Sequence, residues 1–108
     1  MWYVFPQIRG LGKSVTAQKF AIASLDEAIA YLGHPILAPR LRMCTDLVIA
    51  TVGRSAEAIF GYPDHLKFHS SMTLFAHATQ VDGMFQTALD KFFEGQFDRP
   101  TIQRLHET

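Results

Sequence analysis

The chain has 108 residues, of which 48% are hydrophobic, and its 10 basic and 10 acidic side chains give a formal net charge of zero. This length and hydrophobic content predict one folded domain over residues 1–108. The charge balance argues against a nucleic-acid partner or an anionic membrane surface, and no apolar run approaches the ~20 residues of a membrane helix. The single cysteine, Cys44, excludes an intramolecular disulfide and favours a reducing cytoplasm.

The chain begins with the apolar run Trp2-Tyr3-Val4-Phe5, followed by Pro6. Domain termini usually lie at the surface, so this run is expected to be a core element separated from an upstream segment. Four such side chains form a large apolar patch, and burial of each is worth roughly 1.5–3 kcal/mol. We therefore expect a homodimer with Trp2 near the contact, or a looser monomer that is prone to aggregate.

Short helices separated by capping residues are predicted for the first half of the chain. Ser14 is expected to cap a helix that ends at Ile22, and the capping box Ser24-Leu-Asp-Glu27 opens a helix at Leu25–Leu32. Pro35 favours the first turn of the next helix. Along that helix apolar residues recur at steps of three and four: Leu37, Leu41, Cys44, Val48 and Val52.

The second half also predicts helices and no sheet. Because no residues alternate with a period of two, we predict an all-α fold, a single-domain orthogonal bundle of about five to seven short helices. Its core should contain Phe68 and Phe75 from one helix and the stripe Phe85, Leu89 and Phe92 from the next. We expect Ser55 to cap a helix at Ala56–Phe60, and Pro63 or Asp64 to begin the next helix. Asp82 should cap a helix that ends at Gly95, and Pro100 should begin the last helix.

The segment Gly10-Leu-Gly-Lys-Ser14 resembles the end of a phosphate-binding loop. In such loops backbone N–H groups hold phosphate, while the lysine and serine reach outer oxygens and Mg²⁺. The complete motif needs a glycine where this chain has Gln7, and no βαβ pattern follows. The preferred interpretation is a glycine turn with Ser14 as a helix cap.

Histidine and cysteine patterns give weak indications of chemistry. His65 and His69 lie one helical turn apart, a spacing that zinc sites use. No second pair or His-Glu-x-x-His motif accompanies them, so we expect solvated helix histidines, no metal and no cofactor. Cys44 lies on an apolar stripe and is expected to be a small buried hydrophobe rather than a catalytic thiol. The sequence identifies no catalytic residue.

Seven ordered blocks of the chain carry a resemblance to a known family: residues 2–7, 10–14, 25–28, 34–37, 39–41, 59–64 and 67–75. On these blocks the chain is identified as a member of the bacterial domain-of-unknown-function family 1810, whose members are small, mainly helical and sometimes labelled calpastatin. No extended inhibitory repeat supports protease inhibition. Family members usually carry an upstream helix that this chain is expected to lack, and Pro63-Asp64-His65 replaces their Pro-Asp-Asp.

Two classes of function remain open. The first is a ligand-binding or enzymatic domain whose polar pocket holds an anionic small molecule, since a guanidinium or an ammonium suits an anion. The second is an interaction or structural module, in which Arg9 pairs with a carboxylate at the core edge and the serines permit close helix contacts. Convergence on one concave pocket would favour the first. The resemblance places the candidate ligand-binding residues within or next to its polar blocks: Gln7, Arg9, Asp64, Lys67, Ser70 and Ser71.

Overall fold

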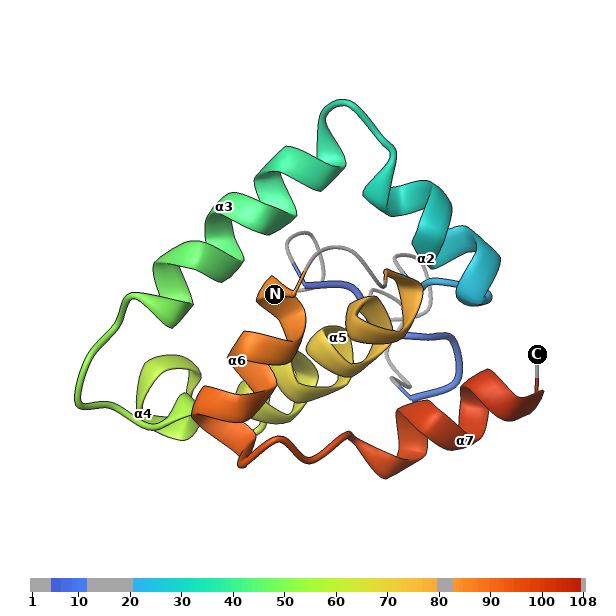
Figure 1. Ribbon diagram of the computed structural model, residues 1–108. Helices are drawn as coiled ribbons and strands as arrows, with labels where there is room; N and C mark the ends of the chain where they lie inside the picture. Colours follow the sequence, from blue (N-terminus) through green and yellow to red (C-terminus); the bar gives the residue numbers. More distant parts are fainter. Residues whose placement is uncertain (1–4, 12–20, 80–82, 108) are drawn as a thin grey trace.

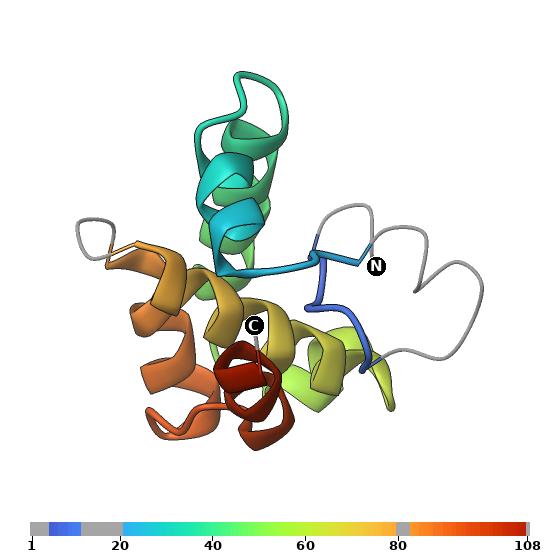
Figure 2. The ribbon, with the colours of Figure 1, turned by 90° about the vertical axis from the view of Figure 1, so that its right-hand side faces the viewer.

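A central helix, α5, organises the computed structural model, which describes residues 5–11, 21–79 and 83–107. Helix α5 contacts α2, α4, α6 and α7 (Figure 1). Figure 2 shows α2 and α3 as a hairpin that rises from the layer containing α5, α6 and α7. The all-α prediction is confirmed for the described part of the chain. Its helices are α2 Leu25–Leu32, α3 Leu37–Ile49, α4 Ala56–Phe60, α5 Asp64–Ala78, α6 Met84–Phe93 and α7 Arg99–Glu107.

Two predicted serine caps are confirmed. Ser24 Oγ accepts the backbone N–H of Glu27 at 3.2 Å, and Glu27 Oε2 accepts the N–H of Ala23 at 3.2 Å. Ser55 Oγ accepts the N–H of Ala58 at 3.1 Å. The bonds from the N–H groups of Glu27 and Ala58 satisfy donors that the first turn of a helix leaves without partners. Local sequence therefore fixes where α2 and α4 begin.

The predicted extent of α3 is wrong at both ends. The helix begins at Leu37 rather than Pro35, where His34 Nδ1 accepts the N–H groups of Ile36 and Leu37, each at 3.1 Å. It ends at Ile49, so Val52 leaves the apolar stripe and is 87% exposed.

Lys91 of α6 secures the segment that follows α3. Its Nζ donates to the carbonyl oxygens of Ile49 and Thr51. A cation favours the carbonyl end of a helix, because the last turn leaves its C=O groups without partners.

Three other predicted helix limits also change. Ile22 does not end a helix: it forms a parallel β-bridge with Ile8, in which its N–H donates to Gln7 O at 2.8 Å and its carbonyl accepts Arg9 N–H at 2.7 Å. Residues 12–20, which include Ser14, lie outside the described residues. Gly83 occupies the N-cap position of α6, and Asp82 also lies outside the described part. Glu94, with a φ of 55°, closes α6 ahead of Gly95.

Aromatic rings around Phe68 form the centre of the core. The Phe68 ring is fully buried and lies 5.0 Å from Phe5, 4.8 Å from Phe60, 6.2 Å from Phe92 and 6.1 Å from Phe93, measured between ring centroids. These rings come from the opening segment, α4, α5 and α6, so their contacts tie four parts of the chain together. Residues 1–4, including Trp2, lie outside the described residues, whereas this chain's own helices cover Phe5.

The hairpin of α2 and α3 joins this core through Tyr31. Its ring packs on Phe75 with centroids 5.3 Å apart. Burial raises the pKa of the Tyr31 phenol, and nearby Arg40 opposes that shift. Among the described residues no helix is long and apolar enough to cross a membrane.

Replacement of Phe68 by alanine should lower the free energy of unfolding by about 3–5 kcal/mol, because the ring is fully buried among four others. Urea unfolding followed by circular dichroism measures this change. The control is Val52→Ala, which removes a side chain that is 87% exposed and should change stability by less than about 0.5 kcal/mol. Equal effects of the two substitutions would contradict the central position of Phe68.

Candidate functional site

A pocket of about 310 Å³ lies where the opening segment meets the first turns of α5 and the start of α7. Half of its eight lining residues are apolar side chains. The polar half comes from all three parts of the chain: Gln7 precedes the β-bridge, Lys67 and Ser70 lie on α5, and Asp98 immediately precedes α7. The lining residues are Gln7, Leu11, Pro63, Leu66, Lys67, Ser70, Asp98 and Pro100.

Lys67 supplies the positive charge of this pocket. Its Nζ lies 3.3 Å from Asp64 Oδ1, one turn earlier on α5, and both side chains are partly exposed. Such a pair at i and i+3 holds the ammonium beside the helix. The neighbouring side chain of Gln7 is buried, and its backbone carbonyl is fixed by the β-bridge to Ile22.

Within the described residues four hydrogen bonds join Asp98 to Ser70, Thr73 and Thr101, and sequence reasoning missed this residue. Its Oδ2 accepts Ser70 Oγ–H at 3.0 Å, Thr101 Oγ1–H at 2.6 Å and Thr101 N–H at 3.2 Å. Its own N–H donates to Thr73 Oγ1 at 2.9 Å. Asp98 therefore caps α7 and joins that helix to α5. An aspartate two residues before Pro100 was the available signal, because aspartate is a preferred N-cap residue.

The structure brings three of the six candidate residues to the pocket. Gln7, Lys67 and Ser70 line it, and Asp64 borders it through its pair with Lys67. The other two candidates lie elsewhere. Arg9 is exposed, is not part of the lining, and forms no ion pair with a residue of the described segments. Ser71 is fully buried, and its hydroxyl finds no hydrogen-bond partner in the described part.

The other sequence motifs take structural positions. Gly10 has a φ of +99°, and the Arg104 guanidinium packs against it so closely that an added Cβ would lie 2.9 Å from Arg104 Cζ. The rest of the phosphate-loop-like motif, residues 12–14, falls outside the described residues. Cys44 is half-buried against the core.

His65 and His69 contact different elements. His65 Nδ1 donates to the Gly61 carbonyl at 3.3 Å, whereas His69 Nε2 donates to the Gln96 carbonyl at 2.7 Å. The His69 ring also stacks on Phe93 with centroids 3.9 Å apart. Within the described segments no three His, Cys, Asp or Glu side chains are placed to hold one metal ion.

Comparison with known proteins places the chain in a family. The sequence profile described as "Protein of unknown function (DUF1810)" matches residues 1–105. The chain belongs to the DUF1810 family. The DUF1810 fold is also seen in the crystal structure of the conserved hypothetical protein Rv1873 from Mycobacterium tuberculosis, which is 53% identical. That alignment has a TM-score of 0.96 and covers 99% of this chain and 76% of the Rv1873 chain. No curated protein matches.

Replacement of Asp98 by alanine in this DUF1810 protein should lower the free energy of unfolding by about 1–2 kcal/mol, because α7 loses its N-cap and Ser70 loses an acceptor. Asp98→Asn keeps an oxygen for the Thr101 N–H and should be milder. Thermal and urea unfolding measure both. Asp90→Ala, at an exposed position of α6, is the control. If Asp98→Ala were no more destabilising than that control, Asp98 would not join α7 to α5.

Proposed function

We propose that the DUF1810 pocket between the opening segment, α5 and α7 binds a small molecule that carries an anionic group and at least one hydrogen-bond donor. One observation carries this proposal. Gln7, Lys67, Ser70 and Asp98 come from segments distant in sequence and line one concave space of about 310 Å³. A pocket with an apolar lining and a few convergent polar groups is the usual form of a small-molecule site.

The charges of the lining determine the chemistry of the ligand. Lys67 offers an ammonium to an anionic group, but its partner Asp64 and the nearby Asp98 make a purely anionic ligand unfavourable. The described hydrogen bonds to the Asp98 side chain converge on Oδ2, so Oδ1 is the oxygen that can accept a donor from a ligand. Amino acids and hydroxy acids carry both kinds of group. The sequence predicted an anionic ligand, and the lining narrows this class to molecules that carry both an anionic group and a hydrogen-bond donor.

Binding is better supported than catalysis. The polar groups of the lining already hold one another: Lys67 pairs with Asp64, and Ser70 donates either to Asp98 or to the Leu66 carbonyl, each at 3.0 Å. Asp98 Oδ2 also accepts two hydrogen bonds from Thr101 as the cap of α7, so we interpret Asp98 as a structural acceptor and the Ser70 hydroxyl as a ligand contact. We also propose a cytoplasmic location, because the single cysteine of the chain is free.

L-Serine, which carries a carboxylate, an ammonium and a hydroxyl, should raise the melting temperature of the protein. Ethanolamine and propionate, each with only part of this set, should raise it less. The Lys67→Met variant should lose the response to serine, because the ligand carboxylate loses its cation. Differential scanning fluorimetry across a concentration series measures these shifts.

The matched control is Arg9→Ala, which removes an exposed cation that does not line the pocket. This variant should keep the full response to serine. Loss of the response in Arg9→Ala, or equal responses of the Lys67→Met variant and the parent, would contradict this position for the ligand. No response of the parent to any amino or hydroxy acid would contradict the proposed function.

The second candidate function, an interaction module, is favoured by one exposed face of α3. Ile36 is 69% exposed, Met43 59% and Leu47 65%, and their spacing of seven and four residues places them on one side of the helix. A straight apolar stripe on one helix can pair with the same stripe of a second copy around a two-fold axis. This candidate is therefore a homodimer that buries the outer face of α3.

Substitution of both Met43 and Leu47 by glutamate should convert such a dimer to a monomer, because the pairing would bury unpaired charges. Sedimentation velocity across a concentration series measures this shift. Val52→Glu, at an exposed position outside α3, should leave the dimer intact. A parent protein that is monomeric at every concentration would rule out this candidate.

A further inference from the structure

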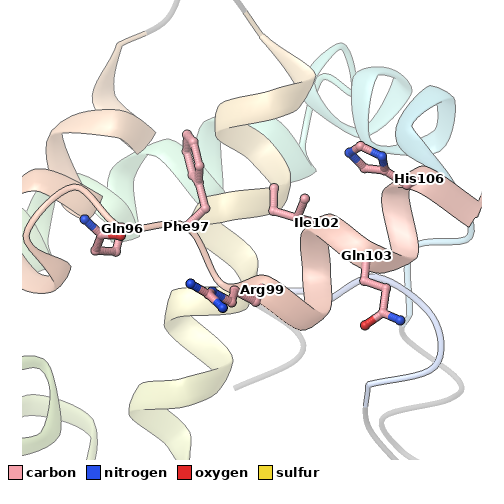
Figure 3. Close-up of a pocket in the computed structure, with 6 residues that line it drawn as sticks. All are labelled: Gln96, Phe97, Arg99, Ile102, Gln103 and His106. Carbon is pink, nitrogen blue, oxygen red and sulfur yellow. The ribbon is translucent and has the colours of Figure 1, made fainter.

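A second hollow, of about 590 Å³, lies along α7 and the turn that leads into it. We infer that this hollow binds a flat aromatic molecule bearing a carboxylate or a phosphate. It shares no lining residue with the pocket described above, so the inference does not depend on the proposed function. Figure 3 shows its six lining residues: Gln96, Phe97, Arg99, Ile102, Gln103 and His106.

Phe97 forms an aromatic wall of this hollow. Its ring remains 41% exposed although it contacts His77 edge-to-face, with centroids 4.6 Å apart. The His77 ring, on α5, is fixed in orientation because its Nδ1 donates to the Thr73 carbonyl of the same helix at 2.8 Å. In Figure 3 the side chain of Ile102 lies beside the Phe97 ring. The wall is therefore oriented before a ligand arrives, and a planar ring can stack on it.

Arg99 supplies a cation to the lining of the same hollow. It is the first residue of α7, it is exposed, and no carboxylate of the described residues lies within ion-pair distance of it. In Figure 3 its guanidinium lies below Phe97 and toward Gln96. A guanidinium can hold a carboxylate or phosphate with two parallel hydrogen bonds, and the amino end of a helix adds to that attraction.

The charge of the lining supports an anion here more strongly than in the first pocket. No acidic residue lines this hollow, whereas Asp98 lines the other. An adjoining hollow shares Ile102 and His106 and extends the apolar surface to Leu25 and Leu105. Gln103 points to the other side of α7 from Phe97 in Figure 3 and is not part of the inferred contact. An aromatic ring on Phe97 and Ile102, with its acid group on Arg99, fits this arrangement.

Two probes distinguish the sources of such a ligand: adenosine monophosphate carries a phosphate, and indole-3-acetate carries a carboxylate. At least one should bind with a Kd below about 1 mM, measured by isothermal titration calorimetry. Phe97→Ala and Arg99→Gln should each weaken that binding about tenfold or more, because each removes one of the two contacts. Arg54→Gln, at an exposed position outside the hollow, is the charge-matched control and should bind as the parent does.

Fragments and a variant of the first pocket sharpen the test. Adenosine and inorganic phosphate should each bind more weakly than adenosine monophosphate, since each offers one contact only. Lys67→Met, a change in the first pocket, should leave binding of the probe to this hollow unchanged. This inference is therefore tested independently of the proposed function. Circular dichroism of Phe97→Ala and Arg99→Gln establishes that both fold. The inference fails if neither probe binds, if both folded variants bind as the parent does, or if phosphate alone binds as tightly as the nucleotide.

Discussion

Enclosure of α5 on all its sides is the constraint on which the rest of the structure depends. From Phe68 to Phe75 all but one residue of this helix are buried, so other elements must surround it. Apolar contacts supply most of the enclosure, and the rings around Phe68 recruit the opening segment, α4 and α6. Hydroxyl groups of the same helix then need partners away from water. Thr73 meets this need by donating to the His69 carbonyl and accepting the N–H of Asp98.

The polar contacts of α5 determine where α7 begins, and hence where both hollows lie. The Asp98 carboxylate accepts a hydrogen bond from Ser70 of α5 and also caps α7. The chain therefore crosses α5 at a fixed point. Residues on either side of that crossing line different spaces. Asp98 and Pro100 line the pocket beside the opening segment, whereas Phe97 and Arg99 line the larger hollow along α7. One hydrogen-bond network thus positions two candidate binding surfaces: one is lined by both a cation and a carboxylate, and the other by a cation without a carboxylate.

Several basic side chains stabilise the fold through contacts with carbonyl groups or a carboxylate. Lys91 lies against the carbonyl groups at and just after the end of α3, and Lys67 pairs with Asp64 on α5. Arg104 of α7 lies against the backbone of Gly10 and donates to its carbonyl at 3.4 Å. Arg9 and Arg99 differ, because within the described segments the side chain of neither forms an ion pair or a hydrogen bond to a carbonyl. Of these two, only Arg99 lines a hollow.

The sequence by itself determined the features that depend on a few neighbouring residues. The caps at Ser24 and Ser55 follow from local hydrogen-bonding rules, and the start of α5 follows from the turn at Pro63. The all-α class follows from the spacing of apolar residues along the chain. The tertiary structure decided what depends on distant partners. Lys91 lies 42 positions beyond the Ile49 carbonyl it contacts, and Asp98 lies 28 beyond Ser70. The sequence predicted one pocket that holds Gln7, Arg9, Lys67 and Ser70. In the folded chain, whose opening segment is bridged to Ile22 through Ile8, Gln7 lines that pocket and Arg9 does not. Long-range contacts form only when elements pack, because their free energy comes from burial that no local pattern contains.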